Sequence, residues 1–300
     1  MKYLIIITFL FSNFSAHTQT LKGTVIDSLT NAKLAYVNIS VKGKNIGTYS
    51  NEKGKYSIDF SQSSKNDTLV VSLIGYKKLK IAVLQFLNSD NNTLNFKMRT
   101  IHEALDEVFI KSEAIKYNKN TIKLKTGNRK QTFPTSSTYG SETAILIENS
   151  KEKRGKLTSL QLKFKTINDK DFKTYQTYYR LAFYAVNDLG FPSDPIYYED
   201  IIIKPEKDQK NFKIDLEGLD IPFLDKGIFV GIETIKPDKV KIEGSMYLTT
   251  PSILYTHTTQ KIKYSRSRSI DWVKHSKKSV FKKRLFAIPF IKVEVKYEAD

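Results

Sequence analysis

The sequence predicts an all-β protein in which two β-sandwiches follow an export signal. Apolar residues alternate with polar ones in short runs over most of the chain, turn residues separate these runs, and no window of useful length has the helical period. We expect a signal in residues 1–20, a seven-stranded sandwich in 21–98, a connection in 99–138 and a jelly-roll-like sandwich in 139–300.

Residues 1–20 have the three parts of a secretory signal. Lys2 supplies the basic charge, an apolar stretch runs from Leu4 to Phe11, and small and polar residues follow as far as Thr20. The apolar stretch is too short to cross a bilayer, which takes about 20 residues, and no later run approaches that length. The alternatives are a buried N-terminal strand or a short membrane anchor. We expect an exported protein, periplasmic or associated with the outer membrane, with no transmembrane segment after the signal is removed.

Composition narrows the chemistry and the partners. The 300 residues include no cysteine, which removes disulfides, thiol chemistry and a lipid anchor on a cysteine. Lys and Arg number 49 against 31 Asp and Glu, a formal net charge of +18. Such a charge is typical of proteins that bind nucleic acid. The predicted export of the protein and the even distribution of lysine along the chain argue against that partner. A solvated basic surface is the simplest interpretation, and any further role of the charge favours acidic polysaccharide or peripheral contact with anionic lipid head groups.

Short alternating runs predict the strands of the first sandwich. The segments are Gly23 to Asp27; Val37, Ile39 and Val41; Thr48 to Ser50; Tyr56, Ile58 and Phe60; Leu69 to Leu73; Leu79, Ile81 and Val83; and Leu94, Phe96 and Met98. About seven short antiparallel strands can bury their apolar faces only by packing sheet on sheet. The stretch Asn51-Glu52-Lys53-Gly54 predicts a turn between two of them. A calcium loop is the alternative, but Lys53 stands where an oxygen ligand would be needed.

These segments carry a resemblance to a known family. The motifs are Gly23-Thr24-Val25-Ile26-Asp27, Leu34-Ala35-Tyr36-Val37-Asn38-Ile39, Gly47-Thr48 with Asn51-Glu52-Lys53-Gly54-Lys55-Tyr56, and Leu69-Val70-Val71-Ser72-Leu73-Ile74-Gly75-Tyr76. In this order they resemble the carboxypeptidase regulatory-like domain family. The resemblance implies a transthyretin-like, seven-stranded Greek-key sandwich in an exported protein of the Gram-negative envelope.

The stretch Leu105-Asp106-Glu107-Val108 belongs to the same resemblance, because a similar stretch follows this domain in many TonB-dependent outer-membrane transporters. Those proteins continue into a plug and a long barrel, and the remaining chain has neither a glycine-rich plug nor a ladder of amphipathic strands with aromatic girdles. The resemblance therefore implies fold and compartment, without transport or peptidase activity.

The connection in 99–138 is polar and basic from Lys111 to Lys130 and ends in chain breakers. A short helix or strand is expected around His102 to Val108. After Gly140 the period of two returns in the runs Leu160, Leu162 and Phe164; Leu181, Phe183 and Ala185; Phe212, Ile214 and Leu216; Ile228, Val230 and Ile232; and Ile291, Val293, Val295 and Tyr297. These runs predict the second sandwich.

Signatures of catalysis are absent. None of the four histidines has Glu three residues later, as a zinc carboxypeptidase would need, and Gly-x-Ser-x-Gly and phosphate-binding glycine loops are missing. We expect no metal, no cofactor and no enzymatic activity. The open alternative is a hydrolase using scattered acidic residues of the loop 187 to 200, which are Asp188, Asp194, Glu199 and Asp200.

The binding residues that we predict lie in one segment. If residues 264 to 268 form a strand, Tyr264, Arg266 and Arg268 share a face, and Trp272 continues that parity. Guanidinium forks beside aromatic rings suit an anionic or hydroxylated ligand. The alternative is a solvent-facing stripe with Trp272 anchoring a loop.

The function predicted from the sequence is a non-enzymatic protein of the cell envelope that acts as an adaptor or binding module, with an envelope protein or an acidic glycan as partner. A glycan-binding accessory protein is the alternative, because the 17 Tyr, 18 Phe and single Trp include rings able to stack on sugars. Its candidates are Tyr175, Tyr178, Tyr179, Tyr184, Tyr197 and Tyr198, although a place in the core or rim of the sandwich explains most of them.

Overall fold

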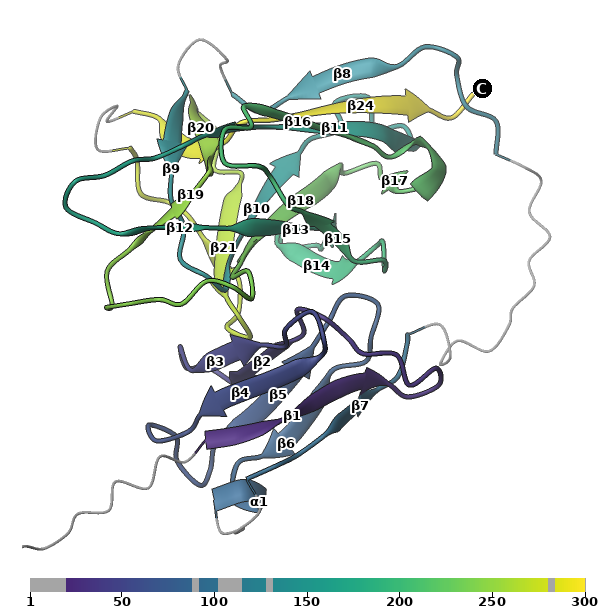
Figure 1. Ribbon diagram of the computed structural model, residues 1–300. Helices are drawn as coiled ribbons and strands as arrows, with labels where there is room; N and C mark the ends of the chain where they lie inside the picture. Colours follow the sequence, from purple (N-terminus) through teal and green to yellow (C-terminus); the bar gives the residue numbers. More distant parts are fainter. Residues whose placement is uncertain (1–19, 88–91, 102–114, 128–131, 280–283, 300) are drawn as a thin grey trace, which may run out of the picture.

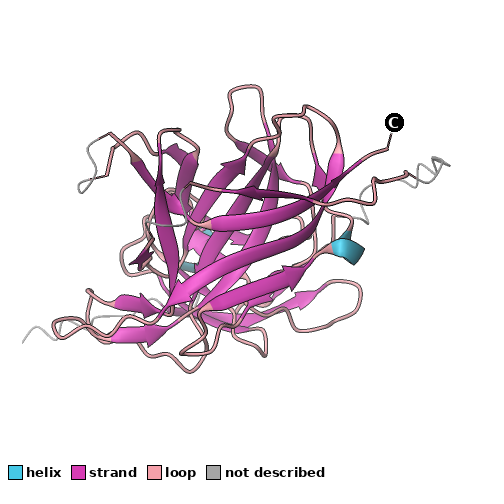
Figure 2. Cartoon of the chain, turned by 90° about the horizontal axis from the view of Figure 1, so that it is seen from above, coloured by secondary structure: helices cyan, strands magenta, loops and turns pink. Residues whose placement is uncertain are grey.

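The computed structural model describes residues 20–87, 92–101, 115–127, 132–279 and 284–299. Its regular structure is almost entirely strand, as predicted (Figure 1, Figure 2). The predicted signal lies outside the described residues apart from Thr20, where the first strand begins. No helix in the described part of the chain is long and apolar enough to span a membrane.

The first domain is a small sandwich. In chain order its elements are β1 (Thr20–Asp27), β2 (Asn38–Val41), β3 (Gly47–Tyr49), β4 (Lys55–Asp59), β5 (Thr68–Ser72), β6 (Leu79–Ala82), α1 (Leu84–Leu87) and β7 (Phe96–Met98). One sheet has the order β4-β1-β7 and the other has the order β3-β2-β5-β6. Their apolar faces enclose one core that includes Val25, Ile39, Ile58, Val71 and Met98.

One strand pair of this domain differs from the expected antiparallel arrangement. β7 pairs with β1 in parallel, with Val25 opposite Phe96 and Asp27 opposite Met98. A parallel pair cannot be joined by a tight hairpin. Here β7 follows β6 and α1 and crosses back to the other sheet, so the connection permits either direction.

The predicted turn at Asn51 is confirmed. The Oδ1 atom of Asn51 accepts hydrogen bonds from the backbone N–H of Lys53 at 3.0 Å and of Lys55 at 2.9 Å. Gly54 follows with φ of +72°, a conformation that glycine adopts without steric cost. The turn joins β3 to β4 and carries Glu52 at its tip.

Strand β2 is more buried than a half-buried strand should be. The side chains of Ile39 and Val41 lie in the core, as the alternation predicts, but Asn38 and Ser40 on the opposite face are buried as well. The second domain covers that face, since the hydroxyl of Ser40 donates to Oγ of Ser269 at 3.0 Å. The polar face of β2 is therefore an interdomain surface.

The second domain is larger and also all-β. Its elements are β8 (Ile122–Lys125), β9 (Phe133–Thr135), β10 (Ser141–Ile147), β11 (Gly155–Lys165), β12 (Thr174–Gln176), β13 (Tyr178–Val186), β14 (Pro192–Pro195), β15 (Ile201–Ile203), β16 (Asn211–Asp215), the 3₁₀ helix η2 (Glu217–Leu219), β17 (Pro222–Phe223), β18 (Ile228–Ile235), β19 (Leu248–Thr250), β20 (Ser252–Thr258), β21 (Lys263–Ser267), β22 (Val273–Lys274), β23 (Phe286–Pro289) and β24 (Ile291–Tyr297).

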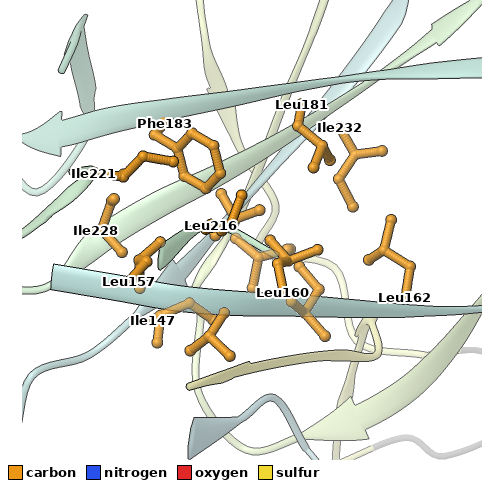
Figure 3. Packing of buried hydrophobic residues seen from close by; sticks show 14 of the residues in the cluster. Ile147, Leu157, Leu160, Leu162, Leu181, Phe183, Leu216, Ile221, Ile228 and Ile232 are labelled. Atoms are coloured by element: carbon orange, nitrogen blue, oxygen red, sulfur yellow. The ribbon is translucent and has the colours of Figure 1, made fainter. Parts of the chain in front are cut away.

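Two large sheets form this second sandwich. One has the order β14-β13-β18-β10-β21-β22, with β15 on β13, and the other has the order β23-β20-β11-β24-β8, with β16 and β17 on β11 and β9 on β20. Their facing sides share one apolar core. In Figure 3, Leu181, Phe183 and Ile232 of the first sheet lie opposite Leu160 and Leu162 of the second.

The expected connection is partly structured. β8 and β9 lie within residues 99–138, and both belong to the second sandwich: Leu124 is opposite Val293 of β24, and Phe133 is opposite Tyr255 of β20. The element expected around His102 to Val108 lies outside the described residues. Part of the connection is thus ordered against the second sandwich. β8 lies in the basic stretch and β9 among the chain breakers, where the alternation of apolar residues is weak.

A separate apolar cluster lies on the outer face of the first of these two sheets. Its buried members are Ala144, Ala182, Tyr184, Phe229 and Tyr264, and Ile74 of the first domain packs against it. Figure 1 shows the first domain beneath this region, with β2 and β3 nearest to it. The junction between the two sandwiches is therefore built on this outer face.

Candidate functional site

A buried arginine joins the two domains. Arg180 of β13 is 3% exposed, and its guanidinium donates from Nε to Oδ1 of Asp200 at 2.6 Å and from Nη1 to Oε2 of Glu233 at 2.8 Å. Nη2 donates to the backbone carbonyl of Tyr36 in the first domain at 2.8 Å. The hydroxyl of Tyr49 donates to the other oxygen of Glu233 at 2.5 Å. Burial lowers the pKa of Arg180, but the two carboxylates outweigh it and hold that pKa above its usual value.

The Asn51 turn makes a second contact between the domains. Glu52 accepts at Oε1 from the hydroxyl of Tyr36 and from Nζ of Lys204, both at 2.9 Å, and its backbone N–H donates to Oδ2 of Asp238 at 2.9 Å. The ammonium of Lys204 also lies 5.4 Å from the ring centre of Tyr178. Hydrogen bonds to Lys204 and Tyr36 lower the pKa of Glu52, which keeps this carboxylate charged.

Glycines permit the close approach of the two domains. A Cβ atom at Gly75, which has φ of +83°, would lie 2.2 Å from the carbonyl oxygen of Tyr198. Gly47 and Gly140 contact the side chain of Arg268 from either domain, where a Cβ atom would come within 2.8 Å and 3.0 Å of it. Gly75 needs glycine because a backbone carbonyl occupies the space of a side chain, whereas at Gly47 and Gly140 the side chain of Arg268 would have to shift.

A cavity of about 670 Å³ lies between the domains, and residues of both line it. Two of its cationic side chains are neutralised, Arg180 as described and Arg266 by Glu142. Five others have no carboxylate within ion-pair distance in the described part of the chain: Lys42, Lys77, Lys78, Lys80 and Arg268. The lining carboxylates of Asp194 and Asp271 are likewise unpaired there. The cavity therefore carries a surplus of positive charge.

Arg266 belongs to a fixed cluster on one wall of the cavity. Its Nε donates to Oε2 of Glu142 at 2.7 Å, and its Nη2 donates to the hydroxyl of Tyr184 at 3.0 Å. That hydroxyl donates to Oε1 of Glu142 at 2.6 Å. The guanidinium carbon lies 4.2 Å from the ring centre of Trp272. Burial lowers the pKa of Arg266, but Glu142 outweighs it, so Arg266 is charged and held in place.

The structure places the four predicted binding residues in two environments. Arg266, Arg268 and Trp272 line the cavity. Tyr264 does not, since it is 2% exposed and its hydroxyl donates to the carbonyl of Gly190 at 2.6 Å. β21 ends at Ser267, and Arg268 has φ of +51°, so the expected alternation stops before Arg268. The binding role of these residues stays a prediction.

Arg268 and Asn38 are the incompletely satisfied groups of the cavity. Nε and Nη1 of Arg268 and Oδ1 of Asn38 are buried and have no hydrogen-bond partner among the described residues. The guanidinium of Arg268 lies 5.3 Å from the ring centre of Tyr49. An unpaired buried polar group costs about 1–3 kcal/mol, so these atoms are available to a group that binds in the cavity.

The acidic residues of the loop 187 to 200 do not form one site. The side chain of Asp188 is fully exposed, Asp194 lines the cavity, and Asp200 is bound to Arg180. Glu199 lies on a second, smaller cavity. In the described ranges, no three His, Asp or Glu side chains come close enough to hold a metal ion.

Three charged residues with little solvent exposure at the junction were not predicted from the sequence. Each of the three interrupts an apolar strand: Arg180 in β13, Glu142 in β10 and Glu233 in β18. Charged residues are rarely buried unless they are paired. A charge inside each of three strands was the signal that could have predicted a paired network on one face of this sheet.

Fold and cavity define a two-domain, all-β protein with an open, basic cavity between its sandwiches. Residues 21–110 match the CarboxypepD_reg-like domain family, so the first domain is a carboxypeptidase regulatory-like domain. Domains of this family are β-sandwiches that are generally non-catalytic. The match extends to Leu105-Asp106-Glu107-Val108, which lies outside the described residues.

Similarity to solved structures is low. A chain of infectious bursal disease virus, Gx strain, has a TM-score of 0.27 and 12% identity, covering 93% of this chain and 63% of the viral chain. This chain thus spans less than two thirds of the viral one. A Bacteroides fragilis protein, described as membrane-associated and of unknown function, has a TM-score of 0.21 and 8% identity. The match covers 93% of this chain and 97% of the Bacteroides chain. Likenesses at these TM-scores say nothing about function. No curated protein matches the sequence.

Proposed function

We propose that this protein is an exported, non-catalytic binding module of the cell envelope that holds an anionic ligand in the cavity between its two domains. The observation that carries the proposal is the set of unpaired cations around that cavity, with Arg268 at the junction of the domains. The volume of about 670 Å³ falls within the range of small-ligand sites. A folded partner protein is too large for it, so a protein partner would have to insert a chain end.

The positive charge of the side chains that line the cavity supports an anion as the ligand. Arg268 presents a planar guanidinium fork suited to carboxylate or phosphate. The four lysines lie on the first domain, at the end of β2 and around β6, and Arg268 lies on the second domain. A ligand that contacts both would be bridged between the domains. The polar contacts of Arg180 and Glu52 and the apolar packing of Ile74 together hold the two walls of the cavity against each other.

Replacing Arg268 tests the site. Arg268→Gln is expected to weaken binding of an anionic probe about 10- to 100-fold, because a hydrogen bond to a charged group contributes about 1.5–3 kcal/mol. The probes are succinate, sulfate and trigalacturonate, and binding is followed by calorimetry and by the fluorescence of Trp272, the single tryptophan. Arg154→Gln makes the same change at an exposed site outside the cavity and should leave affinity unchanged. Absence of binding by every anion to the wild-type protein would reject the proposal.

Lys78 gives the binding a pH dependence. Burial lowers the pKa of Lys78, and Arg266 and Lys80 lower it further, while Asp194 and Glu142 oppose the shift. A lysine is charged below its pKa, and an anion stabilises that charged form. Affinity should therefore be greatest at neutral pH and fall as pH rises through the lowered pKa of Lys78, earlier than for a lysine with the ordinary pKa.

Calorimetry from neutral to alkaline pH checks this prediction. In Lys78→Gln the early loss of affinity should disappear, and binding should be weaker at neutral pH. Lys97→Gln, at an exposed position on β7 outside the cavity, is the matched control. An unchanged pH profile in Lys78→Gln would show that Lys78 does not contact the ligand.

A further inference from the structure

We infer that the ligand is a sugar acid, a carbohydrate unit that carries both a carboxylate and free hydroxyl groups. This inference rests on the proposed anion-binding function and adds the chemical class of the ligand. Its basis is the mixed lining of the cavity, in which unpaired acceptors stand among unpaired cations.

The acceptors come from both domains. Asp194 and Asp271 of the second domain line the cavity and have no ion pair in the described part of the chain. Asn38 of the first domain is 6% exposed, and its Oδ1 has no donor among the described residues. Water reaches Asp194 and Asp271, which are both exposed, whereas Oδ1 of Asn38 is buried. A ligand made only of acceptor oxygens, such as sulfate or a simple polycarboxylate, brings no donor to replace that water or to reach Asn38, and the two carboxylates repel it. Sugar hydroxyls donate to them.

The unpaired cations indicate that the ligand also carries negative charge. The five unpaired cations outnumber the two unpaired carboxylates. A zwitterion such as an amino acid would balance the acids but leave most of the cations unmatched. An oligosaccharide with a carboxylate on each ring matches several separate cations and still carries donors. A neutral sugar fits the acceptors alone.

Aromatic side chains and hydroxyls complete the lining. Tyr76, Tyr198 and Trp272 line the same cavity, as do Ser72 and Ser193. Ligand sites combine aromatic surface with a few placed polar groups, and a sugar ring presents an apolar face and a hydroxyl rim to such a wall. A peptide with acidic side chains presents carboxylates but few hydroxyl donors, so the lining favours the carbohydrate.

The test compares two probes of equal charge. Trigalacturonate and propane-1,2,3-tricarboxylate each carry three carboxylates, but only the first has hydroxyl groups. We expect the wild-type protein to bind trigalacturonate at least about 10-fold more tightly. In the double variant Asp194→Ala, Asp271→Ala the preference should fall about 10- to 100-fold, because hydrogen bonds to charged acceptors are lost. Removing the two carboxylates weakens repulsion for both probes, so a fall in the ratio of affinities is opposite to what relief of repulsion alone would give to the compact probe.

Matched controls make the outcomes distinct. Asp188→Ala with Asp208→Ala removes the same charge at exposed sites outside the cavity and should keep the wild-type ratio. Thermal melting confirms that each variant is folded. Equal binding of both probes, or tighter binding of a triglutamate peptide than of trigalacturonate, would overturn the sugar-acid inference and leave anion binding intact. Binding of maltotriose as tightly as trigalacturonate would overturn it too, and no binding of any anion would reject the proposed function itself.

Discussion

Replacing Arg180 by methionine is expected to destabilise the protein by about 3 kcal/mol, because it leaves two partly buried carboxylates without their counterion. The side chains of Asp200 and Glu233 are only 25% and 12% exposed, so water cannot fully replace the guanidinium. The variant also loses the hydrogen bond to the carbonyl of Tyr36, which links the two domains. Chemical denaturation at neutral pH measures the loss.

Two further variants interpret that result. Lys226→Met removes the exposed ion pair with Asp188 and should change stability by no more than about 0.5 kcal/mol. Arg180→Met combined with Glu233→Gln should recover part of the loss, because the amide keeps an acceptor for Tyr49 without a buried charge. If Arg180→Met is as stable as the wild-type protein, the carboxylates are hydrated and the network does not hold the junction.

Gly75→Ala is expected to separate the two domains without unfolding either. The new methyl group would meet the carbonyl oxygen of Tyr198 at 2.2 Å, and the φ of +83° adds strain of about 1–2 kcal/mol. The two large apolar cores share no residue, so each sandwich keeps its own packing. Small-angle scattering should show a longer particle, and anion affinity should fall at least about 10-fold, since the cavity needs both walls.

Gly43→Ala is the matched control for Gly75→Ala. Gly43 has φ of +72° in the same domain, but a Cβ atom there meets nothing within 4 Å. Its substitution should cost only the backbone strain and leave both the shape of the particle and the affinity unchanged. Identical behaviour of the two variants would mean that the contact at Tyr198 does not govern docking.

Much of the fold could be predicted from local patterns. The alternation of Tyr56, Ile58 and Phe60 corresponds to β4, and Asn51 with Gly54 forms the turn before it. The run from Ile291 to Tyr297 is β24, with every second residue buried. These features depend on near neighbours in the sequence, because the strand period and turn conformations are set within a few residues.

The candidate site could be predicted only in part. The chemistry of Arg266, Arg268 and Trp272 predicts ligand binding, and these residues line the cavity. The same pattern predicts ligand binding by Tyr264, which is buried. The strand period assigns a face to each residue without saying how deeply that face is covered. The contribution of the first domain, and of Lys78 in particular, had no local signal.

Local patterns in the sequence are enough to predict the all-β class, the regulatory-like first domain, the seven strands of the first sandwich and five strands of the second, β11, β13, β16, β18 and β24. Only the tertiary structure decided that β7 lies parallel to β1, that β8 and β9 join the second sandwich, and that the polar face of β2 is covered. The physical reason is that a polar strand face is the same sequence pattern whether it meets water or a second domain. Burial of Asn38 and Arg180 depends on partners that lie far away along the chain.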